Sequence, residues 1–371
     1  MAKLMVGILQ APTHKAKFQS FDNETRLKLA IQAVGKLYAR AFDQTNRHDL
    51  GIFVAPEYFF SRKNANQPVQ QAGGGKYYSR GIDENDKEEN LETFKELTAK
   101  LTHPTGKLLL IPGTMAWLKP FDREKGIARH RAAEKEKRSP GKALPDRGAK
   151  AAHDLDYAAL KRGRQIYRGH THHPANDMRY ARWGAETGFV GGNAYGNRPV
   201  PRTDEKRDLI TNRQDQVQIL RNSLYVISGG QVLHKYNKVA DYHEVLDMDD
   251  QPSVFVPGDM ERQTKELFGK RFGFEICLDH DLDILGFGRG KPIKEAVDFQ
   301  ILLSAKVDTK QAYLKDGGIF IHASSDKHQT GVLRKLNGQM DWVGEATDLN
   351  DILDGDCTMR YFRTEANIAV K

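Results

Sequence analysis

The segment RFGFEICLDH, residues 271–280, decides how this chain of 371 residues is interpreted. Its apolar residues run into a polar turn that begins at Cys277, which is the pattern of a strand that ends at the edge of a sheet. The chain has only one other cysteine, Cys357, so a disulfide scaffold is excluded and a single bridge would consume this thiol. The sequence therefore presents one cysteine side chain at the end of a strand, and a reducing cytoplasm is the expected location.

Two other polar side chains stand at the ends of apolar runs. Glu57 lies in VAPEYFF, residues 54–60, where Pro56 cannot continue a β-ladder, and Lys238 lies in LHKYNKV, residues 233–239. A thiol, a carboxylate and an ammonium group brought together supply a nucleophile, a proton-transfer group and a cation for an oxyanion. Taken singly, each has a plainer explanation: a buried inert cysteine, a surface carboxylate in a salt bridge and a solvated lysine.

The first third of the chain alternates between strand and helix patterns. Apolar runs predict strands at residues 4–10, 50–56 and 108–113, and helical spacing of apolar residues predicts helices at 25–42 and 83–102. This β-α-β-α-β order indicates an α/β protein. Further along, Gly229 and Gly230 separate two strand-like segments and predict a tight hairpin.

The middle of the chain breaks this alternation. Residues 119–165 are highly charged, and residues 166–215 are rich in Gly, Asn, Arg and His with few aliphatic residues. We predict one domain over 1–371 with an insertion at 119–215, because the insertion has too little apolar content for a core of its own. Its aromatic residues, including Trp183 and Tyr195, are expected to pack near the mouth of the active site and to contact the substrate.

The formal net charge of +8 comes from this insertion. Residues 119–182 hold 17 Lys and Arg against 8 Asp and Glu, a net of +9, which leaves −1 for the rest of the chain. A basic block can bind nucleic acid, but a solvated charged face is the commoner explanation, so nucleic acid is not the expected partner. The histidines of residues 170–173 have no cysteine or carboxylate at a structural-zinc spacing, and no metal is predicted. No apolar run approaches the roughly 20 residues of a membrane helix, and no signal-peptide pattern is present.

Six motifs in order resemble the carbon–nitrogen hydrolase (nitrilase) superfamily, which splits amide or nitrile C–N bonds. The matching segments cover roughly residues 1–118 and 217–371; they are MVGILQAP (5–12), DLGIFVAPEYFF (49–60), GKLLLIPGTMAW (106–117), NSLYVISGGQVLHKYNKV (222–239), SVFVPGD with RFGFEICLD (253–279), and VDFQILLSA with GGIFIHASSD (297–326).

The resemblance implies an α-β-β-α sandwich that dimerises or forms larger homo-oligomers. It also implies a Glu57–Lys238–Cys277 triad that acts on a small-molecule amide and requires no cofactor. Glu57 would transfer protons, and Lys238, chosen over Lys235, would stabilise the oxyanion together with the backbone N–H of Leu278. A nearby ammonium lowers the pKa of a thiol, so Lys238 is expected to favour the Cys277 thiolate.

Other positions are implied with less detail. Members of this superfamily often carry a second glutamate downstream of the lysine, and Glu244 is the candidate, with Asp241 as the alternative. Tyr58, next to Glu57, would wall the site. Three-residue spacing on a turn argues against a Cys277–His280 pair.

The residues that follow Cys277 help to decide between a nitrilase-type and an amidase-type reaction. Nitrilases commonly have Trp-Glu there, whereas this chain has Leu278-Asp279, which favours an amidase-type reaction. Two alternatives remain open. One is an acyltransferase that uses the same thioester, and the other is an inactive scaffold whose basic insertion binds nucleic acid or a protein partner.

Overall fold

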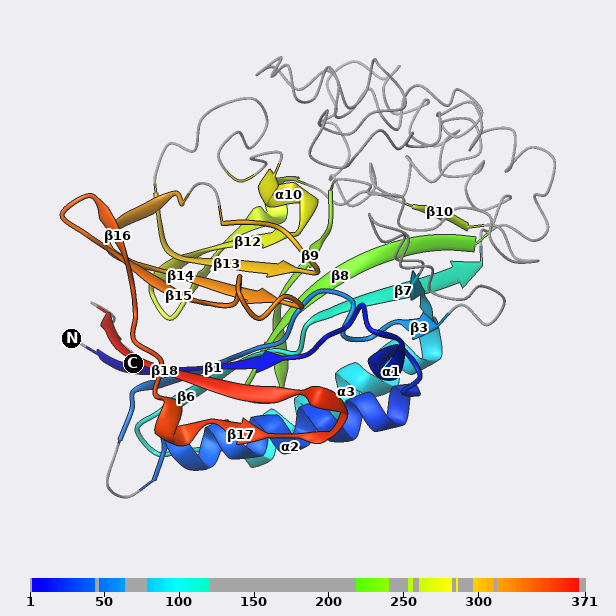
Figure 1. The fold of residues 1–371 in the computed structure, drawn as a ribbon, viewed down its shortest axis with the longest axis horizontal. Helices are drawn as coiled ribbons and strands as arrows, with labels where there is room; N and C mark the ends of the chain where they lie inside the picture. The colour runs from blue at the N-terminus through cyan, green and yellow to red at the C-terminus, as the bar shows by residue number, and fades with distance from the viewer. Residues whose placement is uncertain are drawn as a thin grey trace, which may run out of the picture.

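The computed structural model describes residues 2–43, 47–63, 79–120, 218–239, 253–255, 260–281, 285, 296–309 and 312–366. The fold is mixed α/β, as the alternation of patterns predicts: two β-sheets pack face to face, and helices cover the far face of the larger sheet (Figure 1). The predicted insertion at 119–215 lies outside the described residues apart from its first two, so its boundaries and the single-domain organisation stay predictions.

The larger sheet contains ten of the described strands in the order β17-β18-β1-β2-β6-β8-β7-β5, with β9 and β10 also paired to β8. Because β1, β2 and β6 are parallel neighbours, their C-terminal ends reach the same edge. The bounds are β1 Ala2–Gln10, β2 Leu50–Val54, β5 Ile82–Asp83, β6 Lys107–Ile111, β7 Thr114–Pro120, β8 Gln218–Ser228, β9 Gln231–Asn237, β10 Ser253–Phe255, β17 Asp351–Ile352 and β18 Thr358–Ala366.

The smaller sheet has the order β11-β12-β13-β14-β15-β16. Its three central strands β12, β13 and β14 are parallel, so the residues that follow them also share one edge. The bounds are β11 Thr264–Leu267, β12 Lys270–Ile276, β13 Val297–Ser304, β14 Leu314–Ser324, β15 Gly331–Leu336 and β16 Gln339–Trp342; a separate two-stranded sheet pairs β3 Arg62–Lys63 with β4 Ser79–Arg80.

Apolar side chains from both sheets form one buried cluster between them. Val6 and Ile8 of β1 belong to it with Phe272 and Phe274 of β12, and the rings of Phe272 and Phe299 stack with centroids 4.5 Å apart. Burial of this surface at about 25 cal/mol per Å² is the main force that holds the sheets together. The catalytic candidates stand where this core meets the shared edge of the strands.

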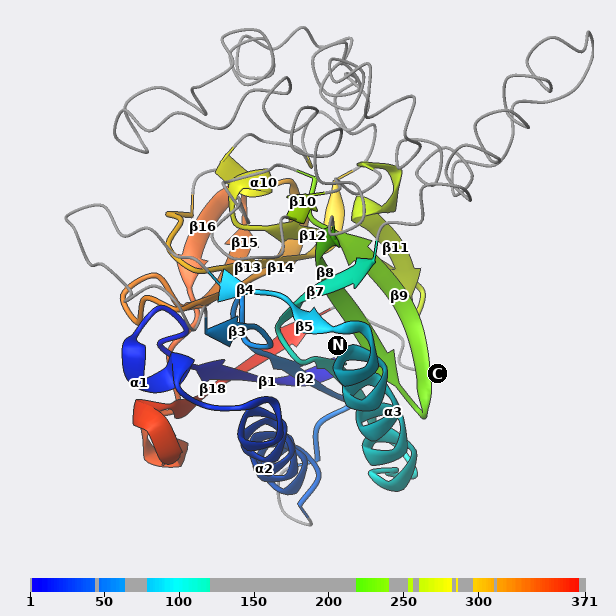
Figure 2. The same cartoon turned by 90° about the vertical axis from the view of Figure 1, so that its right-hand side faces the viewer.

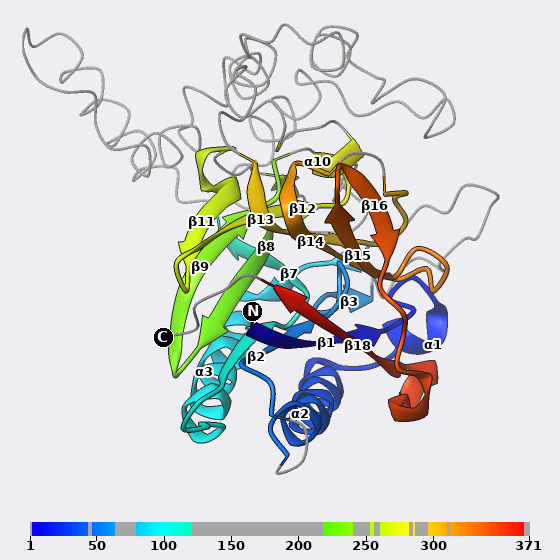
Figure 3. The ribbon, with the colours of Figure 1, turned by 90° about the vertical axis from the view of Figure 1, so that its left-hand side faces the viewer.

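Two amphipathic helices cover the outer face of the larger sheet, α2 Asn23–Ala41 and α3 Glu84–Lys100 (Figures 2 and 3). Asp22 caps α2 by accepting a hydrogen bond from the Thr25 N–H at 2.8 Å. Both helices lie within two residues of their predicted bounds. A short helix, α1 Ala16–Gln19, precedes them.

Three layers of the predicted α-β-β-α sandwich are therefore visible. Within the described ranges, the α-helix that the smaller sheet contributes is the one-turn helix α10, Leu278–Asp281, which follows β12. One turn does not make a helical layer, so the fourth layer stays a prediction. The predicted hairpin between β8 and β9 is present, with positive φ angles of 54° and 80° at Gly229 and Gly230. Over the described ranges, none of the helices has the length and apolar content needed to cross a membrane.

Candidate active site

The three predicted catalytic side chains come together at the shared edge of the two sheets. Glu57 follows β2, Lys238 follows β9 and Cys277 follows β12. The Lys238 Nζ lies 2.8 Å from Glu57 Oε1, and the Glu57 carboxylate also interacts with the Cys277 thiol, whose pKa it raises. The side chains of Glu57 and Lys238 are fully buried, and Cys277 is 8% exposed. A carboxylate thus lies between an ammonium group and a thiol in a site largely shielded from water.

Besides Lys238, two further donors hold the Glu57 carboxylate. Its Oε1 also accepts a hydrogen bond from Asn222 Nδ2 of β8 at 3.1 Å, and its Oε2 accepts one from the backbone N–H of Ala305, just after β13, at 3.0 Å. A buried charge is costly unless it is paired and hydrogen-bonded, and these contacts meet that condition. They also fix the direction of both carboxylate oxygens.

Cys277 occupies a sharp turn. Its φ of +49° lies in the left-handed region, which costs a non-glycine residue about 1–3 kcal/mol. Its N–H donates to the Leu303 carbonyl at 2.8 Å, and its own carbonyl accepts from the His280 N–H at 2.9 Å, so both sides of the turn are tied down. Leu278 begins α10, and the N–H groups of a first helical turn have no acceptor inside the helix.

The pKa of the Cys277 thiol is well above its usual range. Burial is the largest cause, and the negative charge of Glu57 adds to it, while Lys238 acts in the opposite direction and is outweighed. Lys238 thus acts on the Cys277 pKa in the expected direction, but burial and Glu57 together act more strongly. The raised pKa favours the thiol form of Cys277 over the thiolate.

Lys238 is positioned by a backbone hydrogen bond and by a side-chain contact. Its N–H donates to the Asn222 carbonyl at 2.8 Å, and its Nζ lies 5.7 Å from the ring centroid of Tyr58. Tyr58, also at a positive φ of 58°, therefore lies near Lys238, and its predicted contact with the substrate stays a prediction. Lys235 belongs elsewhere: its Nζ lies 5.0 Å from the ring centroid of Trp117, among other cations, and burial lowers its pKa to about 7.

Asp279 is a site residue that sequence reasoning did not assign a role. Its carboxylate is fully buried and accepts hydrogen bonds from the Val239 N–H at 3.1 and 3.2 Å and from the Tyr236 hydroxyl at 2.6 Å. It therefore joins the turn that carries Cys277 to the strand end that carries Lys238. The only signal in the sequence is its place two residues after the nucleophile.

His280 faces a different partner. Its Nδ1 lies 2.7 Å from Glu275 Oε2, which also accepts from Gln300 Nε2 at 2.7 Å. Because the thiol of Cys277 interacts with Glu57, the structure agrees with the expectation that Cys277 and His280 do not act as a dyad.

The remaining sequence-predicted residues lie outside the described ranges. These are Glu244 with its alternative Asp241, the aromatic residues Trp183 and Tyr195, and the histidines at 170, 172 and 173. Their predicted roles stay predictions.

Comparison with known proteins finds similarity in structure rather than in sequence. No protein-family model matches the chain, and no curated protein matches it. Among solved structures, a mutant of the Nesterenkonia AN1 amidase from the nitrilase superfamily has a TM-score of 0.41 at 10% identity, covering 98% of this chain and 91% of that one. A CN-hydrolase superfamily protein from Xanthomonas campestris has a TM-score of 0.38 at 11% identity, covering 92% and 86%.

A glutamine-dependent NAD(+) synthetase from Cytophaga hutchinsonii has a TM-score of 0.37 at 12% identity, covering 98% of this chain and 43% of the other. Likenesses this distant leave the activity to be argued from the chain's own side chains.

Proposed function

We propose that this protein hydrolyses the C–N bond of a small non-peptide amide through a thioester on Cys277. The observation that carries the proposal is a single buried carboxylate, Glu57, that contacts both the Cys277 thiol and the Lys238 ammonium group. A thiol with a raised pKa needs a base in contact with it, and Glu57 is that base.

The first half of the reaction follows from this geometry. Glu57 takes the proton from Cys277 as the sulfur attacks the substrate carbonyl carbon. The oxygen gains negative charge, which the Lys238 ammonium and the Leu278 N–H stabilise. When the C–N bond breaks, Glu57 returns its proton to the leaving nitrogen, which departs as ammonia or an amine.

The second half releases the acid. A water molecule gives a proton to Glu57 as its oxygen attacks the thioester carbon. The C–S bond then breaks, and the thiolate of Cys277 takes the proton back from Glu57. Each step reuses one carboxylate that the Asn222 side chain and the Ala305 N–H hold in a fixed direction.

The test is ammonia release from a panel of small aliphatic and aromatic amides by wild-type protein and by Cys277→Ala. We expect wild type to release ammonia from at least one amide and the variant to release none above background. Equal release by both proteins would contradict the proposal. Product analysis with and without an added amine acceptor separates hydrolysis from the alternative acyl transfer, since a hydrolase releases free acid without the acceptor and a transferase needs it for turnover.

The assembly and location are further proposals. We propose a homodimer or larger homo-oligomer with no nucleic-acid partner, acting in the cytoplasm without a bound cofactor. Light scattering during size-exclusion chromatography tests the assembly, and a monomeric mass would contradict it.

A further inference from the structure

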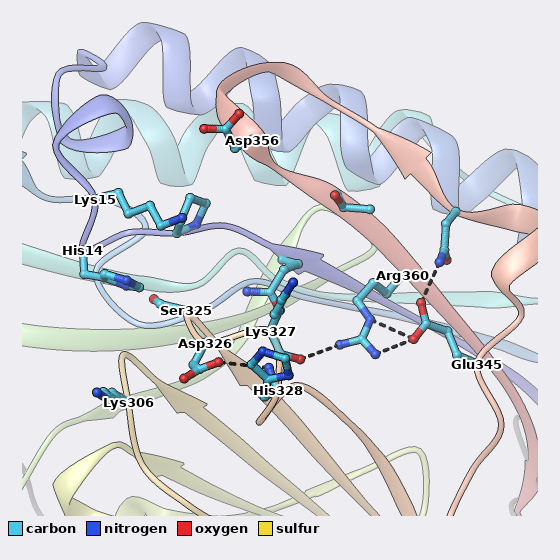
Figure 4. Close-up of a pocket in the computed structure, with 14 residues that line it drawn as sticks. His14, Lys15, Lys306, Ser325, Asp326, Lys327, His328, Glu345, Asp356 and Arg360 are labelled. Carbon is cyan, nitrogen blue, oxygen red and sulfur yellow. Dashed lines mark hydrogen bonds and ion pairs between the residues drawn. The ribbon is translucent and has the colours of Figure 1, made fainter.

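A cavity lies at the same edge of the sheets, and its lining does not include the triad. It has a volume of 580 Å³. Figure 4 shows that His14 and Lys15, from the segment after β1, face the turn after β14 that carries Ser325 and Asp326 across this space. The remaining walls come from the segment after β13, from residues 345–350 and from β18.

Among the charged side chains that line the cavity, the cations without an ion pair outnumber the carboxylates without one. Its cations are Lys15, Lys306, Lys327 and Arg360, and its carboxylates are Asp326, Glu345 and Asp356. Two of the carboxylates are already paired: Glu345 binds the Arg360 guanidinium, and Asp356 lies 3.1 Å from the Lys17 Nζ, which is outside the cavity lining.

Three ammonium groups and one carboxylate therefore remain. Lys15, Lys306 and Lys327 form no ion pair with any carboxylate of the described residues. The pKa of His14 is lowered by burial and then by Lys15, while Lys306 also lowers it and Asp326 acts against them. The imidazole thus lies in a net positive environment, which is the environment that an anion favours.

We propose that this cavity binds a metabolite-sized anion carrying phosphate or carboxylate groups, with Lys15, Lys306 and Lys327 as its cationic contacts. The volume is that of a small-molecule site, and the cations of its lining that are left unpaired outnumber the unpaired carboxylates, which favours an anion. This inference does not depend on the proposed amide chemistry.

The cavity walls touch the segments that hold Glu57. Thr13, next to His14, donates its hydroxyl to the Glu57 carbonyl at 3.0 Å and contacts the Ser325 hydroxyl. Ala305, next to Lys306, donates its N–H to Glu57 Oε2 at 3.0 Å. Lys15 and Lys306 therefore lie within two residues of the groups that bind the backbone carbonyl and the carboxylate of Glu57.

The experiment measures binding of citrate and of inorganic phosphate to the full chain by isothermal titration calorimetry, with sodium chloride at matched ionic strength as the control. The test variant is Lys306→Gln with Lys327→Gln. The matched variant is Lys3→Gln with Lys265→Gln, which removes two exposed positive charges away from the cavity. A single Lys327→Gln variant and circular dichroism of all variants guard against misfolding.

We expect at least one anion to bind wild type and the Lys3/Lys265 variant equally, and the Lys306/Lys327 variant about tenfold or more weakly, because that variant lacks two of the three cationic contacts. Binding of citrate alone or phosphate alone would identify which anionic group the site takes. The proposal is overturned if neither anion binds wild type at about 10 mM, or if both double variants bind as wild type does. Because binding is read by heat, failure of the amide proposal would leave this result unaffected.

Discussion

Replacing Glu57 by glutamine should make Cys277 more reactive toward an alkylating agent while it abolishes turnover. The reason lies in the opposing effects on the thiol: the carboxylate of Glu57 raises the Cys277 pKa, and the ammonium of Lys238 lowers it. Glutamine keeps the shape and the hydrogen-bonding capacity of the side chain but removes its negative charge. Only the effect of burial and the opposing effect of Lys238 then remain.

The magnitude follows from the contact between the two groups. Two unit charges about 4 Å apart interact by about 4 kcal/mol at an effective dielectric constant of 20. Lys238, whose Nζ lies 2.8 Å from Glu57 Oε1, already neutralises part of this repulsion in the wild type. If the remaining repulsion between the Glu57 carboxylate and the Cys277 thiolate is only about 1.4 kcal/mol, its removal in Glu57→Gln still raises the thiolate fraction at pH 7.5 about tenfold.

The assay is the rate of iodoacetamide labelling at pH 7.5, followed by peptide mass spectrometry. Cys357 serves as an internal control, because it is fully buried and its pKa is raised to about 12 by burial and by Asp356 and Asp354, without a contribution from Glu57. Glu266→Gln, on the exposed side of β11, is the matched charge variant. Labelling of Cys277 in Glu57→Gln that is unchanged or slower would refute the proposed balance of charges around the thiol.

Three further outcomes are expected. Asp279→Asn should lower kcat by about 10- to 100-fold with the fold retained, because hydrogen bonds to a buried charge are worth about 1.5–3 kcal/mol; steady-state kinetics with circular dichroism checks this, and an unchanged kcat would remove Asp279 from the positioning of Lys238. His322 is buried with its pKa lowered to about 3 by burial and by His280, so below pH 6.5 the unfolded state binds more protons and the free energy of unfolding falls by about 1.4 kcal/mol per pH unit. Urea denaturation at pH 5 and pH 7 should show a smaller difference for His322→Gln than for wild type, and an equal difference would contradict the assignment. Deleting about residues 119–165 should leave activity on a small amide largely unchanged, while Trp183→Ala or Tyr195→Ala should alter the KM for a bulky amide more than kcat on small substrates; complete loss of activity after the deletion would make that segment part of the catalytic machinery.

The strand ends were the part of the site that could be predicted from the sequence. Glu57, Lys238 and Cys277 each follow a short apolar run, so each could be placed at a strand end. Their meeting was expected from the family resemblance, because β2 and β12 belong to different sheets and β9 is antiparallel to its neighbour β8. The contacts of Asn222 and of the Ala305 N–H with Glu57 could not be predicted, because they join residues 165 and 248 positions apart and one donor is a backbone group.

The direction of the Cys277 pKa needed the structure for a different reason. Sequence motifs show that a lysine and a glutamate lie near the thiol, but they do not show how deeply the thiol is buried. Burial is the largest cause of the rise and decides the sign against Lys238. The helices α2 and α3 were predictable because their apolar residues recur at helical spacing, whereas the tie between Asp279 and Val239 depends on a turn geometry that no periodicity reveals.

The most direct test of the central claim is to trap the acyl-enzyme. Wild-type protein is mixed with the best amide of the panel, quenched in acid within the first turnovers and digested for peptide mass spectrometry. The account predicts an added acyl mass on the peptide that contains Cys277, and no added mass in Cys277→Ala. An acyl group on any other residue, or hydrolysis of the amide by Cys277→Ala at the wild-type rate, would contradict it.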